Sequence, residues 1–483
     1  MQLSALLDGL EILECTADLQ SQITGVSYDS RKVRPGELFV AVTGFAADGH
    51  KFIPMAASKG ASAVLCEREP EEDVPYIKVA STRHALAVVS ANWFGRPAEK
   101  MCMIGITGTN GKTTSTYLLK SVLEQTLGAK VGLIGTIQNM IGDTVIETER
   151  TTPESYELQQ LFAEMYHAGC THVIMEVSSH ALVLSRVDTV RFCVGVFTNL
   201  TEDHLDFHKT MEEYCRAKAM LFSRCETGVV NADDAYCAQI TRDACCRILS
   251  YGVHSETAQL RAENLELRAS GVAFDAVYED CRAHAKLAIP GRFSVYNALG
   301  VIGAALALGL PLEKITAALA NSSGVKGRAE VVPTPGKEYT VLIDYSHTPD
   351  SLENILRTVR GFCEGRLIAV FGCGGDRDPY KRPIMGEAAG RLADYSIVTS
   401  DNPRTESPMA IINDIVAGMK NVPHGYRVIE NRVEAIEWAL ANARPGDVIV
   451  LCGKGHETYQ EVNHVKHHMD EREIVAAYLE RET

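Results

Sequence analysis

The sequence predicts an α/β protein of three domains, at residues 1–97, 98–326 and 327–483. Strand-like and helix-like segments alternate along almost the whole chain, which indicates layered α/β domains. A chain of 483 residues is also too long for one ordinary hydrophobic core. A glycine-rich loop between a strand and a helix opens the second domain. The third domain has the strand–helix rhythm of a parallel, Rossmann-like sheet.

The first domain is expected to contain short strands at 38–42 and 63–66 and a helix at 52–59, and the break at Gly95-Arg96-Pro97 makes a plausible linker. The second opens with a strand at 101–106 and a helix at 113–127. Its further buried strands are expected at 131–135, 172–177 and 192–198. The alternating polar segment 259–289 predicts an insertion or edge hairpins. The third begins near Gly327 and predicts strands at 340–343, 366–371, 395–399 and 447–452.

Composition excludes several classes of protein. Hydrophobic residues make up 46% and charged residues 23%, as in soluble globular proteins. The net charge of −15 argues against a nucleic-acid partner. The first residues lack a signal-peptide pattern, and the most apolar stretch, 301–310, is too short to span a bilayer. The 14 cysteines are scattered without a CxxC pair, so we expect reduced thiols in a cytoplasmic protein without a membrane partner.

The glycine loop lies at 104–114, between the predicted strand and helix, where main-chain amides and a helix N-terminus can hold phosphates. Lys112 would reach the terminal phosphates, and the Thr113 hydroxyl would bind Mg²⁺. The strict pattern GxxxxGK[ST] is missed by one position, because Ile106 stands where the first glycine is required. The alternative is a glycine-rich turn with an exposed lysine.

The compact run Gly108-Thr109-Asn110-Gly111-Lys112-Thr113 resembles the ATP loop of the Mur ligases and of the related folylpolyglutamate synthases. The resemblance covers essentially the full chain. It implies ATP and Mg²⁺ as cofactors, a UDP-binding first domain, and a central P-loop ATPase-like domain with a mostly parallel sheet. The ATP-binding residues that it implies in this loop are Gly108, Thr109, Asn110, Gly111, Lys112, Thr113 and Thr114.

Two further segments of the second domain carry ligand-type side chains. Glu176 ends a buried strand, where an unpaired carboxylate is unusual, so it is a candidate Mg²⁺ ligand. Segment 198–206 has an equally good alternative as a helix cap, with Asp203 and Asp206 at a first turn. Both segments resemble the Mur-ligase patterns around the metal-binding glutamate and the catalytic histidine, here His204.

Lys218 lies on a predicted amphipathic helix at 211–222, and from the sequence alone it is a solvated lysine. The resemblance implies a carbamylated lysine, whose carboxylate-like oxygens help to bind a second Mg²⁺. The implied catalytic residues are therefore Lys112, Glu176, His204 and Lys218. The implied metal-binding residues are Thr113, Glu176 and Lys218.

Other matching segments extend the ATP and UDP-substrate sites. Segment 291–297 resembles the family's adenine-contacting region, although Ser294 stands where asparagine is more usual. Asn297, Arg328 and Asp344 are the remaining ATP-binding residues. Turn residues around a strand would explain Gly36 and Gly49 in the first domain, but not Ser30-Arg31. The UDP-substrate residues implied are Ser30, Thr151, Thr152, Ser178 and Arg186; Arg150 and Leu184 depart from the family's usual asparagine and glutamine.

The third domain carries the most discriminating signal. Asp401-Asn402-Pro403-Arg404 resembles the motif of the family members that add diaminopimelate, an amino acid with a carboxylate and an ammonium at its far end. Arginine can bind a carboxylate through two parallel hydrogen bonds. The glycine runs at 372–375 and 453–455 have a weaker alternative as phosphate loops. The amino-acid-binding residues expected are Arg377, Asp401, Asn402, Pro403, Arg404, Gly453 and Glu457.

The resemblance thus implies a monomeric ligase of peptidoglycan precursor synthesis. ATP would phosphorylate the D-glutamate γ-carboxylate of UDP-N-acetylmuramoyl-L-alanyl-D-glutamate, and meso-2,6-diaminopimelate would attack the acyl phosphate. An L-lysine-adding ligase is disfavoured by Arg404, and a folylpolyglutamate ligase by Ser30-Arg31. A regulatory NTPase that makes no bond would leave the amino-acid pocket unexplained.

Overall fold

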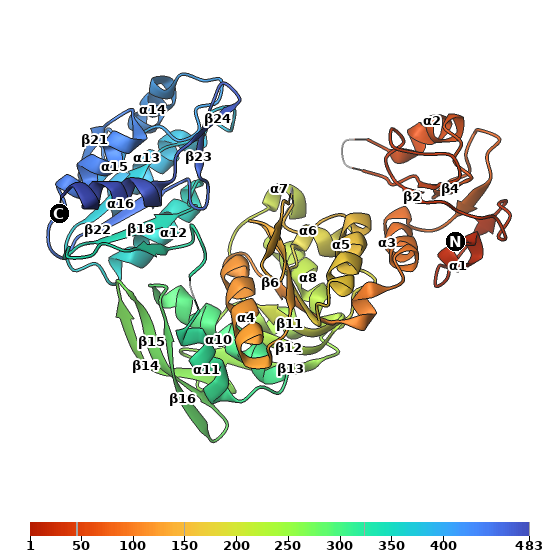
Figure 1. Ribbon diagram of the computed structural model, residues 1–483, viewed down its shortest axis with the longest axis horizontal. Coiled ribbons are helices and arrows are strands. Elements are labelled where there is room, and N and C mark those ends of the chain that lie inside the picture. Colours follow the sequence, from red (N-terminus) through yellow and green to blue (C-terminus); the bar gives the residue numbers. More distant parts are fainter. Residues whose placement is uncertain (45–46, 149, 323, 483) are drawn as a thin grey trace. The chain divides into compact units, whose positions relative to one another are not determined.

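Three larger β-sheets and one two-stranded sheet are found in the computed structural model, which describes residues 1–44, 47–148, 150–322 and 324–482 (Figure 1). The predicted α/β fold class is confirmed. The contacts of the chain divide it into a first unit, Met1–Gln259 with Gly303–Leu310, and a second unit, Leu260–Ile302 with Pro311–Thr483. The domain boundaries after 97 and 326 stay predictions. No helix in the described ranges is long and apolar enough to cross a membrane.

The N-terminal sheet has the order β1-β5-β4-β3-β2, and all its pairs are parallel except β1 with β5. Its strands are β1 (Glu14–Cys15), β2 (Val26–Ser27), β3 (Leu38–Val40), β4 (Ala63–Cys66) and β5 (Tyr76–Lys78). The predicted helix at 52–59 is α2 (Ile53–Ser58), preceded by the short helix η1 (Gly49–Phe52). A longer helix, α3 (Thr82–Trp93), begins at Ser81, whose hydroxyl accepts a hydrogen bond from the His84 amide at 3.3 Å.

Within the first unit the central sheet has the order β13-β12-β11-β6-β10-β7-β8-β9. Its strands are β6 (Cys102–Thr107), β7 (Val131–Ile134), β8 (Asn139–Ile141), β9 (Thr144–Ile146), β10 (His172–Glu176), β11 (Phe192–Phe197), β12 (Cys225–Asn231) and β13 (Arg247–Gly252). All pairs from β13 to β7 are parallel. The chain passes from β10 to β11 across β6, so the carboxyl end of β6 is a topological switch point, the usual place of a binding site.

Helix α4 (Lys112–Leu127) follows β6 directly and begins one residue before its predicted start. Gly111 and Gly128 lie just outside its two ends with φ of 84° and 61°, a left-handed backbone that glycine adopts without strain. Its side chains Leu118, Leu119 and Val122 are buried, and the helix packs on β6, β7 and β10. The N-terminus of α4 is thereby fixed at the switch point.

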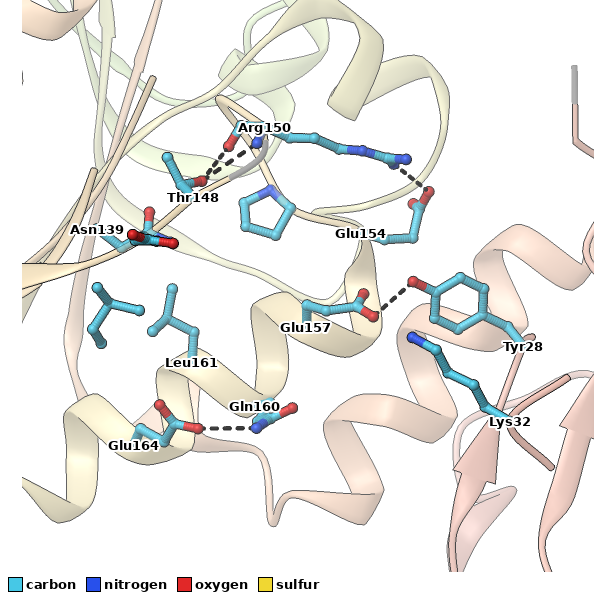
Figure 2. Close-up of a pocket in the computed structure, with 13 residues that line it drawn as sticks. Tyr28, Lys32, Asn139, Thr148, Arg150, Glu154, Glu157, Gln160, Leu161 and Glu164 are labelled. Carbon is cyan, nitrogen blue, oxygen red and sulfur yellow. Dashed lines mark hydrogen bonds and ion pairs between the residues drawn. The ribbon is translucent and has the colours of Figure 1, made fainter. Parts of the chain in front are cut away.

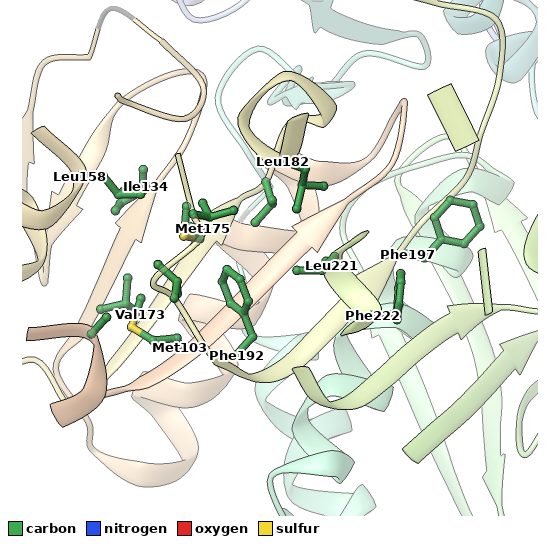
Figure 3. Close-up of a cluster of buried hydrophobic side chains, with 14 of the residues drawn as sticks. Met103, Ile134, Leu158, Val173, Met175, Leu182, Phe192, Phe197, Leu221 and Phe222 are labelled. Carbon is green, nitrogen blue, oxygen red and sulfur yellow. The ribbon is translucent and has the colours of Figure 1, made fainter. Parts of the chain in front are cut away.

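The core of the central domain packs between this sheet and its helices. Met103, Met175 and Phe192 project from neighbouring strands toward Leu182 and Leu221 (Figure 3). All five are fully buried or nearly so, and burial of one such side chain contributes roughly 1.5–3 kcal/mol. The helical elements on this side are α5 (Ser155–His167), α6 (Ser179–Val183), α8 (Met211–Ala219) and η3 (Met220–Ser223). The predicted helix at 211–222 is therefore split into α8 and η3.

The second unit begins with an antiparallel meander of β14 (Leu260–Arg268), β15 (Gly271–Tyr278) and β16 (Cys281–Leu287). The predicted hairpins at 259–289 are confirmed. Helix α10 (Arg292–Ala307) comes next, and its part after Ile302 belongs to the first unit; α11 (Leu312–Ala320), again in the second unit, packs on β16.

The C-terminal sheet has the order β17-β18-β22-β19-β20-β21, parallel from β18 to β21, which confirms the predicted Rossmann-like sheet. Its strands are β17 (Glu330–Val332), β18 (Thr340–Asp344), β19 (Leu367–Phe371), β20 (Tyr395–Val398), β21 (Gly425–Val428) and β22 (Val448–Cys452). Its helices are α12 (Pro349–Arg360), α13 (Lys381–Leu392), α14 (Pro408–Ala417), α15 (Arg432–Ala441) and α16 (Glu471–Arg481). A separate hairpin, β23 (Tyr459–Val462) and β24 (Val465–His468), follows β22.

Candidate active site

The glycine loop at the carboxyl end of β6 is closely packed against the loop that follows β11. Gly108 has a φ of 149°, and a Cβ atom there would lie 1.9 Å from Thr198 Oγ1, so only glycine fits. The amides of Thr109 and Asn110 donate to Asn199, each at 2.9 Å. Lys112 is half-buried, and its Nζ donates to the carbonyls of Gly108 and Thr109, both at 2.8 Å. The loop thus runs straight into the N-terminus of α4, an arrangement that suits phosphate groups.

Glu176, at the end of β10, is fully buried beside this loop. Its Oε1 accepts hydrogen bonds from Thr113 Oγ1 and from the Thr136 amide, both at 2.9 Å, and its Oε2 accepts one from Thr136 Oγ1 at 3.0 Å. All three donors are neutral, and no ion pair of Glu176 is found in the described part of the chain. A buried carboxylate without a cationic side chain, next to a threonine hydroxyl, is an oxygen donor set that fits Mg²⁺. Sequence reasoning missed Thr136, although its place after the buried strand β7 could have indicated it.

Four of the five predicted UDP-substrate residues also surround Glu176. Thr151 Oγ1 lies 3.0 Å from Thr136 Oγ1, and Thr152 Oγ1 donates to the Glu176 carbonyl at 2.8 Å. Ser178 caps α6 and lies 3.3 Å from Thr152 Oγ1. Arg186 donates to the Thr152 carbonyl at 3.0 Å and to Glu154 at 2.9 Å. These hydroxyls therefore form one polar cluster with the predicted metal ligand.

Ser30, the fifth, is buried in the N-terminal domain against Met55. Its neighbours Tyr28 and Lys32 line a cavity of about 510 Å³, as do Arg150 and Pro153, which flank Thr151 and Thr152 (Figure 2). Tyr28 donates to Glu157 at 2.7 Å; burial first, and then this carboxylate, raises the pKa of Tyr28 well above its usual value. The two predicted UDP-substrate segments thus border the same cavity.

Lys218 is 1% exposed, so the expectation of a solvated lysine on an amphipathic helix is wrong. Its Nζ donates to the Gly108 carbonyl at 2.9 Å and lies 4.4 Å from the centre of the Tyr214 ring. Burial, and then the charge of Lys112, hold the pKa of Lys218 well below its usual value. A lowered pKa favours the neutral amine, which is the form that reacts with carbon dioxide.

His204 has a φ of 54° and immediately precedes the short helix α7 (Leu205–His208). The side chain of His204, the N-cap residue, makes no capping hydrogen bond, but Asp203 Oδ1 accepts one from the His204 amide at 2.8 Å. The Asp206 side chain lies outside the described part of the structure, so the helix-cap alternative stays a prediction. The His204 ring is 47% exposed and stands edge-on to Tyr214 at 6.1 Å, and the Tyr214 hydroxyl lies 3.2 Å from Thr109 Oγ1. A tyrosine therefore connects the histidine to the glycine loop.

The remaining predicted ATP residues lie in the second unit. Asn297 is buried on α10. Asp344 ends β18 and accepts hydrogen bonds from the Ala329 amide at 2.7 Å and from the Ser346 hydroxyl. The Arg328 guanidinium lies 5.3 Å from the Tyr345 ring centre, and its buried Nε has no hydrogen-bond partner in the described ranges. A buried donor without a partner is expected where a ligand acceptor binds.

The predicted amino-acid residues follow the carboxyl ends of three neighbouring strands, β22, β19 and β20. Arg404 donates through Nε to Glu461 Oε2 at 3.1 Å and through Nη1 to the Gly375 carbonyl at 2.7 Å. Arg377 is exposed and has no hydrogen bond within the described ranges. Neither glycine run at this edge leads directly into a helix, as 108–112 does, so the alternative of phosphate loops finds no support here.

Asn402 organises the opposite side of this loop cluster. Its Oδ1 accepts hydrogen bonds from Lys454 Nζ at 2.6 Å and from the Glu461 amide at 2.9 Å, and its Nδ2 donates to Glu457 Oε2 at 2.9 Å. Pro403 is buried, and Gly453 has a φ of 111°, with a Cβ position 2.6 Å from Asp401 Oδ2. Sequence reasoning gave no role to Lys454 and did not identify Glu461.

Comparison with known proteins gives one consistent result. Residues 22–94 match the Mur ligase family, catalytic domain, 106–305 the Mur ligase middle domain, and 327–455 the Mur ligase, glutamate ligase domain. The UDP-N-acetylmuramoyl-L-alanyl-D-glutamate--2,6-diaminopimelate ligase 1 of Clostridium acetobutylicum is 48% identical over 482 residues, 99% of both chains. The corresponding ligase of Clostridium botulinum is 47% identical over 98% of this chain and 99% of its own.

Solved structures agree with these relatives. A structure of a UDP-N-acetylmuramoyl-L-alanyl-D-glutamate--2,6-diaminopimelate ligase superposes with a TM-score of 0.76 and 32% identity over 100% of this chain and 99% of that one. The MurF ligase of Thermotoga maritima in complex with ADP shares the fold, with a TM-score of 0.60 and 18% identity over 96% and 99% of the two chains. The chain belongs to the Mur ligase family.

Proposed function

We propose that the protein is the ligase that joins meso-2,6-diaminopimelate to the D-glutamate γ-carboxylate of UDP-N-acetylmuramoyl-L-alanyl-D-glutamate, with conversion of ATP to ADP and phosphate. The relatives that match it over nearly their full length carry this activity in their names. The observation that carries the amino-acid assignment is the cluster formed by the loops after β20 and β22, in which Arg404 and Glu457 offer a cation and an anion.

The ATP phosphates fit the glycine loop and the N-terminus of α4. Lys112 would leave the carbonyls of Gly108 and Thr109 for the phosphoryl oxygens, because a charged acceptor makes the stronger hydrogen bond. The γ-phosphoryl group passes to the γ-carboxylate and gives an acyl phosphate and ADP. The amine of the incoming amino acid then attacks the acyl carbon, and phosphate leaves from the tetrahedral intermediate. The contribution of the protein is positioning and charge neutralisation.

The oxygen donors around Glu176 support a Mg²⁺ site formed with Thr113. Mg²⁺ would neutralise charge on the phosphates. The buried, low-pKa amine of Lys218 supports carbamylation, because a neutral amine can add to carbon dioxide and a carbamate restores a charge suited to a second Mg²⁺. His204, connected through Tyr214 to the loop, is placed among the catalytic residues on the family pattern.

The UDP-linked substrate is assigned to the polar cluster of Thr151, Thr152, Ser178 and Arg186, with Ser30 across the adjoining cavity. We propose that the enzyme acts as a monomer. We place the reaction in the cytoplasm, where ATP is available, and it needs no nucleic-acid or membrane partner.

The amino-acid pocket favours diaminopimelate over L-lysine. Arg404, with the exposed Arg377, would bind the distal carboxylate, and Glu457 the distal ammonium. Lysine has no distal carboxylate and would make no charge-assisted hydrogen bonds to these guanidinium groups, each of which contributes roughly 1.5–3 kcal/mol. Sites built around such a polar partner discriminate by about 10⁴-fold.

The test is kcat/KM for both amino acids with the wild type and Arg404→Ala. We expect the wild type to prefer diaminopimelate by about 10⁴-fold and the variant to lose far more of its activity with diaminopimelate than with lysine. Phosphate release should require both the UDP-dipeptide and the amino acid. Equal use of the two amino acids by the wild type, or an equal loss in the variant, would refute the role of Arg404.

A further inference from the structure

Lys454, in the loop after β22, is a lysine whose side chain is completely buried. Its Nζ donates to Asn402 Oδ1 at 2.6 Å and to Glu457 Oε2 at 2.7 Å, and it lies 5.1 Å from the centre of the Tyr459 ring. A buried ammonium group is costly unless each of its protons has an acceptor. Here two protons have oxygen acceptors and the charge also faces an aromatic ring, so the lysine is held in one position.

The partners of Lys454 distinguish it from a purely structural ion pair. Arg432 and Glu471, in the same domain, are both fully enclosed, and Arg432 also donates to the main-chain carbonyl of Cys452. Lys454 instead contacts two side chains already assigned to the amino-acid pocket. Its counter-ion Glu457 keeps 14% of its side chain exposed, whereas Lys454 has none. The lysine of this ion pair is therefore buried, and the carboxylate is the partner that reaches solvent.

The two oxygens of Glu457 have different surroundings. Oε2 accepts hydrogen bonds from the Lys454 ammonium and from the Asn402 side-chain amide, whereas Oε1 has no hydrogen bond within the residues that the structure describes. A carboxylate has about four lone-pair positions, so Oε1 keeps its capacity for an ammonium donor. Because Lys454 and Asn402 both bind Oε2, they fix the orientation of the whole carboxylate and thus of Oε1.

The same pattern occurs on the other side of the pocket. Glu461 accepts from Arg404 Nε, and Asn402 joins the two halves because its Oδ1 accepts both Lys454 Nζ and the Glu461 amide. Arg404 and Glu457, the two less exposed charges proposed to bind the amino acid, thus each have a counter-ion in the protein. The four charged groups, Arg404, Glu461, Lys454 and Glu457, sum to zero, which matches a ligand end that carries one ammonium and one carboxylate.

We propose that Lys454 is a positioning residue of the amino-acid pocket, which holds Glu457 so that its free oxygen accepts the distal ammonium of a zwitterionic amino acid. The inference rests on the proposed function, since it names the group that orients one of its binding residues. Lys454 contacts Glu457 and Asn402 and acts on the substrate only through them.

A double-mutant cycle on the full-length enzyme tests this role. Lys454→Met should raise KM for diaminopimelate about 10- to 100-fold, as expected for a lost charge-assisted hydrogen bond, with kcat and KM for ATP changed less than about threefold. In the Glu457→Gln background the same substitution should add little, because the two residues act as one unit. Lys454→Gln, which keeps a donor but not the charge, should fall between the wild type and Lys454→Met.

Lys466→Met is the matched control. Lys466 is an exposed lysine over the same Tyr459 ring, at 4.2 Å, and it makes no hydrogen bond to Glu457. Its removal should leave KM for diaminopimelate unchanged. Additive losses in the cycle, an equal rise of KM for all substrates, or loss of the folded state in both Lys454→Met and Lys454→Gln would show that the lysine serves only the fold.

The two proposals fail in distinguishable ways. Without the proposed function, wild-type enzyme would show no phosphate release that depends on diaminopimelate. Without a positioning role for Lys454, wild-type turnover would remain intact and only the selective effect of Lys454→Met on KM would be missing.

Discussion

The loops at the carboxyl ends of the central and C-terminal sheets differ in the partners of their charged side chains. In the central domain, Lys112 and Lys218 both donate to main-chain carbonyls, and buried Glu176 accepts only neutral donors. In the C-terminal domain, Arg404 contacts Glu461, and Lys454 contacts Glu457. The contacts named for the central site join a charged group to a neutral one, whereas those named for the C-terminal site join opposite charges.

This difference corresponds to the ligands proposed for the two sites. ATP with Mg²⁺ brings its own charges, so cations and a carboxylate that contact neutral groups gain stronger, charge-assisted interactions from its binding. A zwitterionic amino acid brings no net charge, and a neutral pocket accepts it without leaving a surplus. The central site is therefore expected to depend on single charged groups more strongly than the amino-acid pocket does.

The largest effect should come from Lys112. Lys112→Ala removes the cation proposed to bind the transferred phosphoryl group, and we expect ADP formation to fall about 1,000-fold or more. Phosphate and ADP release measure this loss, and an unchanged thermal unfolding midpoint shows that the fold is retained. Turnover near the wild-type rate would refute the assignment of the ATP site to this loop. It would also refute the proposed difference between the two regions.

Lys218→Ala should follow, with a loss of about 100-fold, because the buried amine and its proposed carbamate disappear. Bicarbonate or a short carboxylate in excess should restore part of the activity by filling the vacated space with an anion. Arg216→Ala, which removes an exposed cation from the same helix, is the control and should have little effect. A high-resolution map of active enzyme with an unmodified Lys218 amine would rule out the carbamate.

Glu461→Gln should have the smallest effect. The side chains of Glu461 and Arg404 are both only 19% exposed, and they share one side-chain hydrogen bond of 3.1 Å; the Arg404 amide also donates to the Glu461 carbonyl at 3.1 Å. We expect KM for diaminopimelate to rise up to about tenfold, with KM for ATP unchanged, because the guanidinium keeps its bond to the Gly375 carbonyl. A loss as large as that of Lys112→Ala would mean that both regions depend equally on single charges.

The order of elements and the main site loops could be predicted because they depend on local patterns. The strand, glycine loop and helix around 101–127 were identified from apolar periodicity and glycine positions, which local chain geometry requires. Side-chain partners from distant segments could not be predicted. Thr136 bonds to Glu176 across 40 residues, and Lys454 bonds to Asn402 across 52. The burial of Lys218 could not be predicted for the same reason, because the apolar pattern of its helix does not reveal the contact with the glycine loop at Gly108.

The tight contact at Gly108 also limits how this loop can vary. Any side chain at this position would collide with Thr198, which is itself 3% exposed and hydrogen-bonded to the Asn110 carbonyl at 2.7 Å. To avoid this collision the backbone of 198–199 would have to move, and this backbone binds the glycine loop through the Asn199 carbonyl. An inhibitor that binds the main chain of Gly108 would thus contact a position at which resistance mutations are incompatible with a working enzyme.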